Sequence, residues 1–212
     1  MGDFVGDTRN GYDAIAVGYA EYFEGEMERE PYGLAMLGAF AQVVQGRVVD
    51  VGCGPGWVTG FLAARGVDVY GVDLSAGMLD VARKGNPGLR FVEGSMTALD
   101  EPDGSLGGVV AWYSVIHMPP ERVVGVFEEF WRVLRPGGHL LLGFQVGDEP
   151  LQMREAFGIE VTLDFHRFRP ERVEEWLEKA GFAVDVRFLR EPDGTGRSSQ
   201  VPQAHMVARK VG

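Results

Sequence analysis

Residues 48–56 read VVDVGCGPG, and this stretch decides the fold that the sequence predicts. Its valines are β-branched and stop at a glycine, as expected of a short strand buried on both faces. Gly52, Gly54 and Gly56 stand at alternate positions, and each removes a side chain from the path of a ligand on the loop. Residues 57–65 have helical spacing, so the loop leads into a helix N-terminus that can face this ligand. A glycine turn can also merely connect a strand to a helix, and the loop alone leaves that interpretation open.

A second strand supplies an acidic partner for this loop. Residues 67–72 are predicted to form the strand, which ends at Asp73, 21 residues beyond Gly52. A ribose-binding acid is expected about 20 residues after such a loop. At the carboxyl end of a parallel strand, the Asp73 carboxylate can accept hydrogen bonds from both ribose hydroxyls. Its other possible role is to cap the helix that follows Ser75.

The charge beside the loop discriminates between nucleoside cofactors. Asp50 precedes Gly52 by two residues, where its carboxylate would repel a pyrophosphate but could help to hold an ammonium or a sulfonium. S-adenosylmethionine carries both of these cations and no phosphate. In addition, the third glycine of the dinucleotide pattern G-x-G-x-x-G would fall at Trp57, a bulky residue. The sequence therefore favours S-adenosylmethionine over NAD.

The rest of the chain continues the alternation of strands and helices up to about residue 145. This pattern predicts an α/β fold in which a parallel sheet carries helices on both faces. In the last third, a loop over residues 191–202 is rich in glycine, serine and proline and is expected to be mobile. Two leading helices, over 12–23 and 34–44, are expected to cover the open edge of the sheet. The further strands are predicted over 89–92, 107–113, 139–144, 182–188 and 204–208. The further helices are predicted after Ser75, carrying Met78, Leu79 and Val81, and over 120–134 and 171–180.

Length and composition indicate one soluble domain. We divide it into an N-terminal helical cap (1–46), a cofactor-binding core (47–145) and an acceptor-side segment with the C-terminal strands (146–212). The formal net charge of -11 disfavours nucleic acid as a partner. Cys53 is the single cysteine, which excludes an intrachain disulfide and a thiolate zinc site and favours the cytoplasm. No membrane-spanning run, secretory signal or metal cluster is expected, and the oligomeric state is not indicated.

Four blocks of the sequence together resemble the class I S-adenosylmethionine-dependent methyltransferases, in particular their small, single-domain type 11 and type 25 members. The resemblance spans roughly residues 12–210 and implies a Rossmann-like sheet of seven strands, mostly parallel, whose last strand is antiparallel and lies between its neighbours. The blocks are VVDVGCGPGWVTGFLAARG (48–66), VYGVDLSAGMLDVAR (69–83), FVEGSMTALD (91–100) and WRVLRPGGHLLLGF (131–144).

The resemblance also implies the residues that bind the cofactor. Many members of the family have an aspartate where this chain has Ser95, so a hydroxyl or the backbone must here contact the exocyclic amine of adenine. Tyr12 and Tyr19 lie in the leading helix, where related enzymes often fold a lid over the cofactor; core packing would explain both tyrosines equally well. The assignment is Asp50, Gly52, Cys53 and Gly54 to the methionyl part, Asp73 and Leu74 to ribose, and Met78, Ser95 and Met96 to adenine.

Candidates for a catalytic role follow the fourth predicted strand, in WYSVIHMPPE (112–121), which resembles the lip of the active site in this family. His117 is the first candidate for a general base because the ordinary pKa of histidine, about 6.5, suits proton removal near neutrality. Tyr113 is the second candidate. His166 is a weaker alternative, and packing is the competing role for each histidine. His139 and His205 are expected to be structural. Cys53 is expected to occupy the glycine loop because its side chain is small, and not to act as a nucleophile.

The sequence thus predicts in-line methyl transfer from S-adenosylmethionine to a small-molecule acceptor. Residues 149–169 are expected to shape the acceptor pocket. One alternative is a non-catalytic module that senses S-adenosylmethionine or S-adenosylhomocysteine, because motifs for binding do not prove turnover. A nicotinamide-dependent oxidoreductase is the other alternative.

Overall fold

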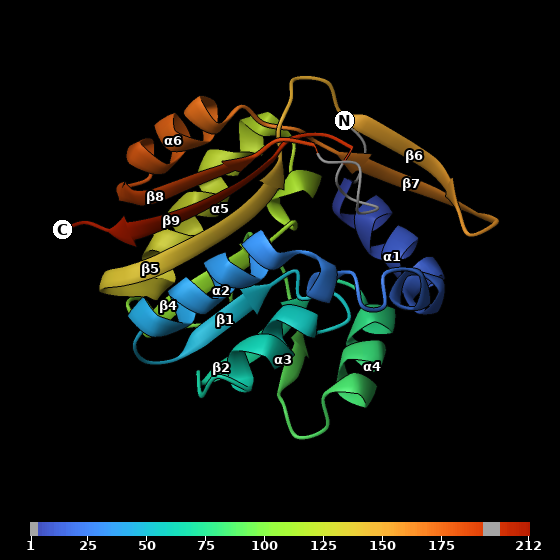
Figure 1. Ribbon diagram of the computed structural model, residues 1–212, viewed down its shortest axis with the longest axis horizontal. Helices are drawn as coiled ribbons and strands as arrows, with labels where there is room; N and C mark the ends of the chain where they lie inside the picture. The colour runs from blue at the N-terminus through green and yellow to red at the C-terminus, as the bar shows by residue number, and fades with distance from the viewer. Residues whose placement is uncertain (1–3, 193–199) are drawn as a thin grey trace.

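A seven-stranded sheet forms the centre of the computed structural model, which describes residues 4–192 and 200–212 (Figure 1). Its strand order is β3-β2-β1-β4-β5-β9-β8, and β9 runs antiparallel to both β5 and β8. The predicted fold is confirmed, including the insertion of the last strand between its neighbours. The strands are β1 (Val48–Val51), β2 (Val69–Asp73), β3 (Phe91–Glu93), β4 (Leu106–Trp112), β5 (Leu134–Gln145), β8 (Phe182–Arg190) and β9 (Gln203–Lys210).

Helices cover both faces of the sheet because each pair of neighbouring parallel strands needs a crossover. On one face, α2 (Pro31–Val43) and α3 (Trp57–Ala63) pack on β1, β4, β5 and β9, and α4 (Ala76–Gly85) packs beside β2 and β3. The other face is covered by α5 (Pro120–Val133) and α6 (Pro170–Lys179). All four residues of β1 are buried, as expected of a strand between two helical layers.

The first helix, α1 (Phe4–Tyr22), crosses the carboxyl ends of the strands. It contacts α4 and the strand β7 (Ile159–Phe165), and a short 3-10 helix (Met27–Arg29) leads from it to α2. The expectation that the two leading helices cover an open edge is therefore wrong. The buried residues of the two helices give the reason. In α1, Ile15 packs on Val161 and Leu163 of β7, whereas the buried side chains of α2 pack on one face of the sheet.

A hairpin of β6 (Leu151–Ala156) and β7 (Ile159–Phe165) follows β5, and no pattern in the sequence predicted it. These strands form a separate two-stranded sheet, which projects beside α1 (Figure 1). Its turn consists of Phe157 and Gly158, whose φ angles of 54° and 76° are both positive, as a type I′ turn requires. Such turns usually carry Asn-Gly or Asp-Gly, so Phe157 concealed the turn in the sequence.

Two other expectations concern the ends of elements. β5 begins at Leu134, before the Pro-Gly-Gly stretch that was expected to precede it, and a register shift against β4 accommodates that stretch. The loop that was expected to be mobile falls largely on residues 193–199, which lie outside the described part of the chain. Among the described helices, none combines the length and the apolar character that crossing a bilayer demands.

Phe40 tests the packing of α2 on the sheet. Its side chain is fully buried beside Leu37, Val110 and Leu141. We expect Phe40→Ala to lower the free energy of unfolding by about 3–5 kcal/mol, because it leaves a cavity that neighbouring side chains fill only in part. Urea unfolding would measure the change, and Tyr32→Ala, at an exposed position of the same helix, is the control. A loss below about 1 kcal/mol in Phe40→Ala would contradict this packing.

Candidate functional site

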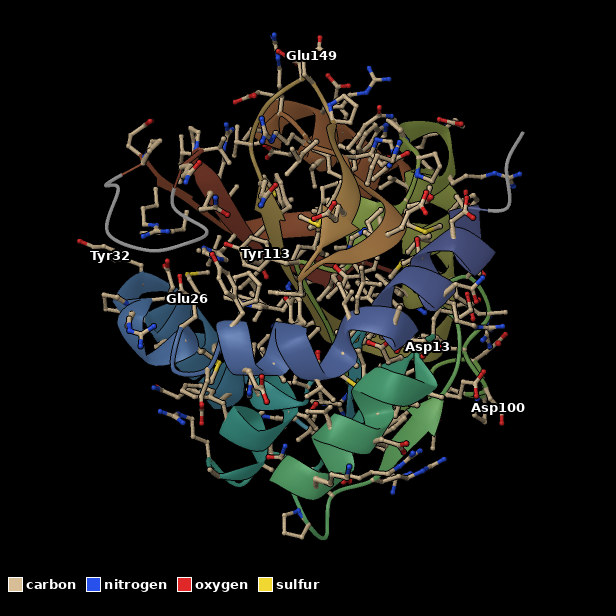
Figure 2. The ribbon with its side chains drawn as sticks, turned by 90° about the vertical axis from the view of Figure 1, so that its right-hand side faces the viewer. Asp13, Glu26, Tyr32, Asp100, Tyr113 and Glu149 are labelled. Carbon is tan, nitrogen blue, oxygen red and sulfur yellow. The ribbon has the colours of Figure 1, made fainter. Side chains whose placement is uncertain are left out.

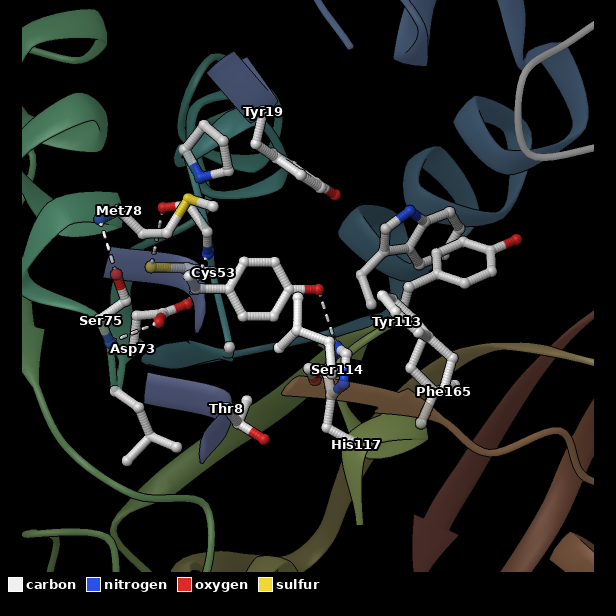
Figure 3. Close-up of a pocket in the computed structure, with 18 of the residues that line it drawn as sticks. Thr8, Tyr19, Cys53, Asp73, Ser75, Met78, Tyr113, Ser114, His117 and Phe165 are labelled. Atoms are coloured by element: carbon white, nitrogen blue, oxygen red, sulfur yellow. Dashed lines mark hydrogen bonds between the residues drawn. The ribbon is translucent and has the colours of Figure 1, made fainter. Parts of the chain in front are cut away.

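A cavity of about 640 Å³ opens at the carboxyl ends of β1, β2 and β4. Its walls come from the glycine loop, from α1, from the segments after β2, β3 and β4, and from the β6–β7 hairpin. This volume lies within the range of about 300–1,000 Å³ that is usual for ligand sites. In Figure 3, Cys53, Asp73, Ser75 and Met78 lie on one side, and Tyr113, His117 and Phe165 lie on the other. Every residue that the sequence assigned to the cofactor lines this cavity, as do the catalytic candidates Tyr113 and His117.

Gly52 allows the end of β4 to lie against the loop. Its φ is 70°, and a Cβ atom built on it would lie 2.3 Å from the Cβ of Ser114. The Ser114 hydroxyl donates a hydrogen bond of 2.6 Å to the carbonyl of Val51, which fixes this approach. Gly54 differs, because its φ is 51° but a Cβ atom there would meet no atom within 4 Å. Gly52 is thus required by packing within the protein, whereas Gly54 leaves space on the cavity wall.

The Asp73 carboxylate holds the loop from the neighbouring strand. One oxygen accepts a hydrogen bond of 2.8 Å from the Gly54 amide, and the other accepts one of 2.9 Å from the Ser75 amide. Ser75 itself is the N-cap of α4, since its hydroxyl accepts a hydrogen bond from the Met78 amide at 3.0 Å. The predicted N-cap at Ser75 is therefore confirmed, and Asp73 is not itself the cap residue of this helix.

Asp13 joins α1 to this end of α4, and the sequence analysis missed it. Its carboxylate accepts hydrogen bonds from the Ser75 hydroxyl at 2.6 Å and from the Gly77 amide at 2.9 Å. Figure 2 shows Asp13 where α1 meets α4. A carboxylate at a helix N-terminus is favoured by the helix dipole. Nothing in the local sequence marks Asp13, because its partners lie more than 60 residues away.

Asp50 is the second carboxylate at the glycine loop, and it is almost fully buried. It accepts a hydrogen bond of 2.7 Å from the hydroxyl of Thr59 in α3. Burial raises the pKa of Asp50 to about 7, even though the Thr59 bond acts in the opposite direction. Burial also raises the pKa of Asp73, while its backbone hydrogen bonds oppose the shift. Two desolvated carboxylates beside one loop form an environment that a cation would stabilise.

Leu74, Met78, Ser95 and Met96 line the cavity beside β2 and β3. The Ser95 hydroxyl shares a hydrogen bond of 2.8 Å with the Thr97 hydroxyl. It can still accept or donate one further bond, since a hydroxyl has one proton and two lone pairs.

His117 lies opposite this part of the cavity, between α1 and the hairpin. Its Nδ1 lies 3.0 Å from the carbonyl oxygen of Asp164, which can only accept, so Nδ1 carries the proton. Its Nε2 is therefore free of a proton and accepts a hydrogen bond of 2.9 Å from the Tyr12 hydroxyl. Burial lowers the pKa of His117 to about 4, so the ring is neutral at physiological pH. The arrangement presents an unprotonated nitrogen with a phenol bound to it.

Tyr113 has a φ of 54°, which is rare for a residue other than glycine. Its hydroxyl lies 3.3 Å from Nε2 of His205, and burial raises its pKa, so the phenol is protonated. Of the other histidines, His166 and His139 do not line the cavity. The interpretation of His166 as an alternative base therefore gains no support. His205, expected to be structural, lies on the cavity wall.

Aromatic side chains form much of the remaining wall. Tyr19 packs edge-on against Tyr12 at 5.8 Å and is stacked with Trp57 at 6.3 Å. The expected acceptor segment contributes Phe165 and the other hairpin residues that line the cavity. Within the described part of the chain, no group of histidine, cysteine and carboxylate side chains could hold a metal ion.

Comparison with known proteins agrees with this arrangement. Residues 48–138 match the family model described as a methyltransferase domain. The chain is 38% identical over 151 residues to a demethylmenaquinone methyltransferase of Beutenbergia cavernae, covering 65% of this chain and 62% of the relative. It is 29% identical over 187 residues to a trans-aconitate 2-methyltransferase of Methylobacterium nodulans, covering 79% of this chain and 69% of the relative. The chain thus spans about three fifths of the length of the first of these relatives.

Solved structures share the fold. The magnesium protoporphyrin IX methyltransferase of Synechocystis PCC 6803, solved with bound SAM, has a TM-score of 0.75 and 16% sequence identity, covering 99% of this chain and 98% of that one. Residues 48–138 thus match a methyltransferase domain, and the order of the seven strands belongs to a fold that these solved methyltransferases share.

Proposed function

We propose that this protein binds S-adenosylmethionine across the glycine loop and transfers its methyl group to a small-molecule acceptor. The observation that carries the proposal is the pair of carboxylates, the buried Asp50 and the half-buried Asp73, on the wall of a cavity beside an open glycine loop. A ligand with an ammonium and a sulfonium, and without phosphate, complements this charge. A pyrophosphate on this loop would face the carboxylate of Asp50, so a nicotinamide dinucleotide fits the loop poorly.

The residues present fit this cofactor in some detail. Each Asp73 oxygen already accepts one amide hydrogen bond, but a carboxylate has about four acceptor positions, so two remain for ribose hydroxyls. The missing side chain at Gly54 leaves room on the wall for the methionyl part. We assign Asp50, Gly52, Cys53 and Gly54 to that part, Asp73 and Leu74 to ribose, Met78, Ser95 and Met96 to adenine, and Tyr12 and Tyr19 to the cover.

When bound, the cofactor supplies an electrophilic methyl group on sulfur. The contribution of the chain is to orient an acceptor in line with that group, to exclude water and to hold a proton. We assign residues 1–46 to the cap over the cavity, 47–145 to cofactor binding and 146–212 to the acceptor side. Tyr113 and His117 lie after β4, on the side of the cavity opposite Asp73 (Figure 3).

His117 is the proposed general base. Its unprotonated Nε2 accepts the hydrogen bond of Tyr12, and the Asp164 carbonyl holds the ring in the required tautomer. As the acceptor releases a proton to the Tyr12 oxygen, the Tyr12 proton passes to Nε2, so the phenol is restored and the imidazole becomes charged. The Tyr113 hydroxyl is proposed to orient the acceptor.

Relatives named as methyltransferases of small molecules support an acceptor of this class. The net charge of -11 supports the exclusion of nucleic acid, and a single, buried cysteine supports a cytoplasmic location. The cavity also extends past the glycine loop to Tyr113 and the hairpin, which supports an enzyme over a sensor of the cofactor alone.

The ribose assignment is tested at Asp73. We expect Asp73→Asn to lower the affinity for S-adenosylmethionine by about 10- to 100-fold, because the amide removes the charge and half of the acceptor capacity. Isothermal titration calorimetry measures the loss, with NAD as a second ligand that should not bind. Asp80→Asn, at an exposed position of α4, is the matched control. Full affinity in Asp73→Asn, or tighter binding of NAD, would refute the assignment.

The charge of Asp50 predicts a pH dependence of cofactor binding. Below about 7 the buried carboxyl is protonated, and a cationic ligand has to displace that proton. The affinity should therefore rise with pH up to about 7, by at most about tenfold per pH unit, and then level off. Asp50→Asn should bind more weakly and lose this rise. Equal slopes in both proteins between about pH 6 and 8 would count against a role for Asp50.

Turnover is tested at His117. We expect His117→Gln to slow the transfer of labelled methyl groups to a metabolite extract by about 10²- to 10⁴-fold while the cofactor affinity is retained. Tyr12→Phe should also slow transfer, because it interrupts the proton path. His166→Gln, off the cavity wall, is the control and should leave the rate unchanged. No transfer by the wild-type protein would favour the sensor, and an unchanged rate in His117→Gln would remove His117 as the base.

A further inference from the structure

The sheet itself forms the end of the cavity that lies beyond Tyr113. Trp112, Gly143 and His205 are register partners on β4, β5 and β9, and Gln145 follows on the face that Gly143 shares. Trp112, Gln145 and His205 all line the cavity. If the glycine-loop half holds the cofactor, as proposed above, this end is available to the acceptor.

Two buried polar atoms at this end have no hydrogen-bond partner. They are Nδ1 of His205 and Oε1 of Gln145, and no atom of the described residues satisfies either. The His205 side chain is only 2% exposed. A buried polar atom without a partner is costly and calls for an explanation, for which a ligand is one candidate.

The His205 ring is neutral, and it is held in place. Burial and then the nearby charge of Arg190 lower its pKa to about 4, and its Nε2 is occupied by the Tyr113 hydroxyl. Trp112 stacks on the ring at 4.5 Å. A neutral Nδ1 and an amide oxygen suit a group that both donates and accepts, such as a hydroxyl or an amine. A carboxylate only accepts, so it cannot satisfy the Gln145 oxygen.

The charges around this end also disfavour an anion. Among the described residues, the charged side chains on the cavity wall are all carboxylates, namely Glu26, Glu30, Asp50, Asp73 and Glu155. Glu30 is paired with Arg190 at 2.9 Å, and Glu26 with Arg29 at 3.4 Å, so each of these two arginines already faces a carboxylate. Glu30 lies close enough to Tyr113 for its charge to raise the pKa of that phenol.

The other surfaces of the cavity are aromatic and favour a ligand with a flat, apolar ring. Tyr113 packs edge-on against Trp112 at 5.6 Å. A Cβ atom on Gly33 of α2 would lie 3.1 Å from the Trp112 indole, so the helix backbone also lies close to this ring. Aromatic walls bind aromatic ligands well through offset and edge contacts. The phenylalanine, tyrosine and tryptophan residues of the wall are Phe4, Tyr12, Tyr19, Tyr22, Phe23, Trp57, Trp112, Tyr113, Phe157 and Phe165.

We propose that His205 and Gln145 form the polar end of the acceptor site, and that the acceptor is an aromatic alcohol or amine rather than a carboxylic or phosphoric acid. The aromatic ring of the acceptor lies among the aromatic side chains of the cavity wall. The hydroxyl or amine of the acceptor donates a hydrogen bond to Oε1 of Gln145. Its oxygen or nitrogen forms a second hydrogen bond with Nδ1 of His205. This inference rests on the proposed function, because the cofactor has to occupy the other half.

The test compares ligands that share one ring and differ in one group. The protein is first saturated with S-adenosylhomocysteine and then titrated with 1-naphthylmethanol, 1-naphthylmethylamine, 1-methylnaphthalene and 1-naphthoate. We expect the alcohol and the amine to bind at least about tenfold more tightly than the acid, and more tightly than the hydrocarbon. Binding of the acid as tight as that of the alcohol, or no binding by any member of the series, would overturn the proposal.

Variants test the two residues. Gln145→Leu and His205→Phe keep the size of each side chain, and they should remove the preference for the alcohol over the hydrocarbon while leaving the affinity for S-adenosylhomocysteine unchanged. The matched controls are Gln45→Leu, at an exposed position, and His139→Phe, in the middle of β5 and off the cavity wall. An unchanged preference in both test variants would overturn the assignment. Failure of the wild-type protein to bind S-adenosylhomocysteine would instead refute the proposed function and this inference together.

Discussion

The close contact between Gly52 and Ser114 is the constraint on which the whole site depends. Because Gly52 has no side chain, the end of β4 lies against the glycine loop, and the Ser114 hydroxyl bonds to the carbonyl of Val51. Tyr113 lies between β4 and Ser114, and its amide donates a hydrogen bond to the Gly143 carbonyl. One glycine therefore sets the positions of two walls, that of the loop and that of the residues after β4.

A helix far away in the sequence closes the cavity between these walls. α1 is held by Asp13 at the start of α4 and by Tyr12 at His117, so its polar contacts reach both sides of the site. Its apolar residue Ile15 packs on Val161 and Leu163 of the hairpin. The position of α1 is thus coupled to the accessibility of His117, and the cover and the proposed base form one unit.

Local signals made the core of this fold predictable. The β-branched run before Gly52, the N-cap at Ser75 and the acid at Asp73 each act through neighbours in the chain, and the strands and helices follow them closely. The hairpin could not be predicted because Phe157 takes a backbone conformation that the sequence normally signals with Asn or Asp. For His205 the limit is different: the insertion of β9 was expected, but not the register that places His205 opposite Gly143 and on the cavity wall. Long-range register of this kind depends on topology, and short motifs do not encode it.

In the β6–β7 hairpin the two strands pair with each other, and neither belongs to the central sheet. It meets α1 mainly through side chains, including Leu163 against Gly11, where a Cβ atom would lie only 2.8 Å away. An element of this kind can be exchanged as a module: a hairpin of another length or composition would change which molecules fit, while the central strands kept their pairing. Evolution, or a protein engineer grafting a new hairpin, could therefore alter selectivity without disturbing the machinery that binds the nucleoside.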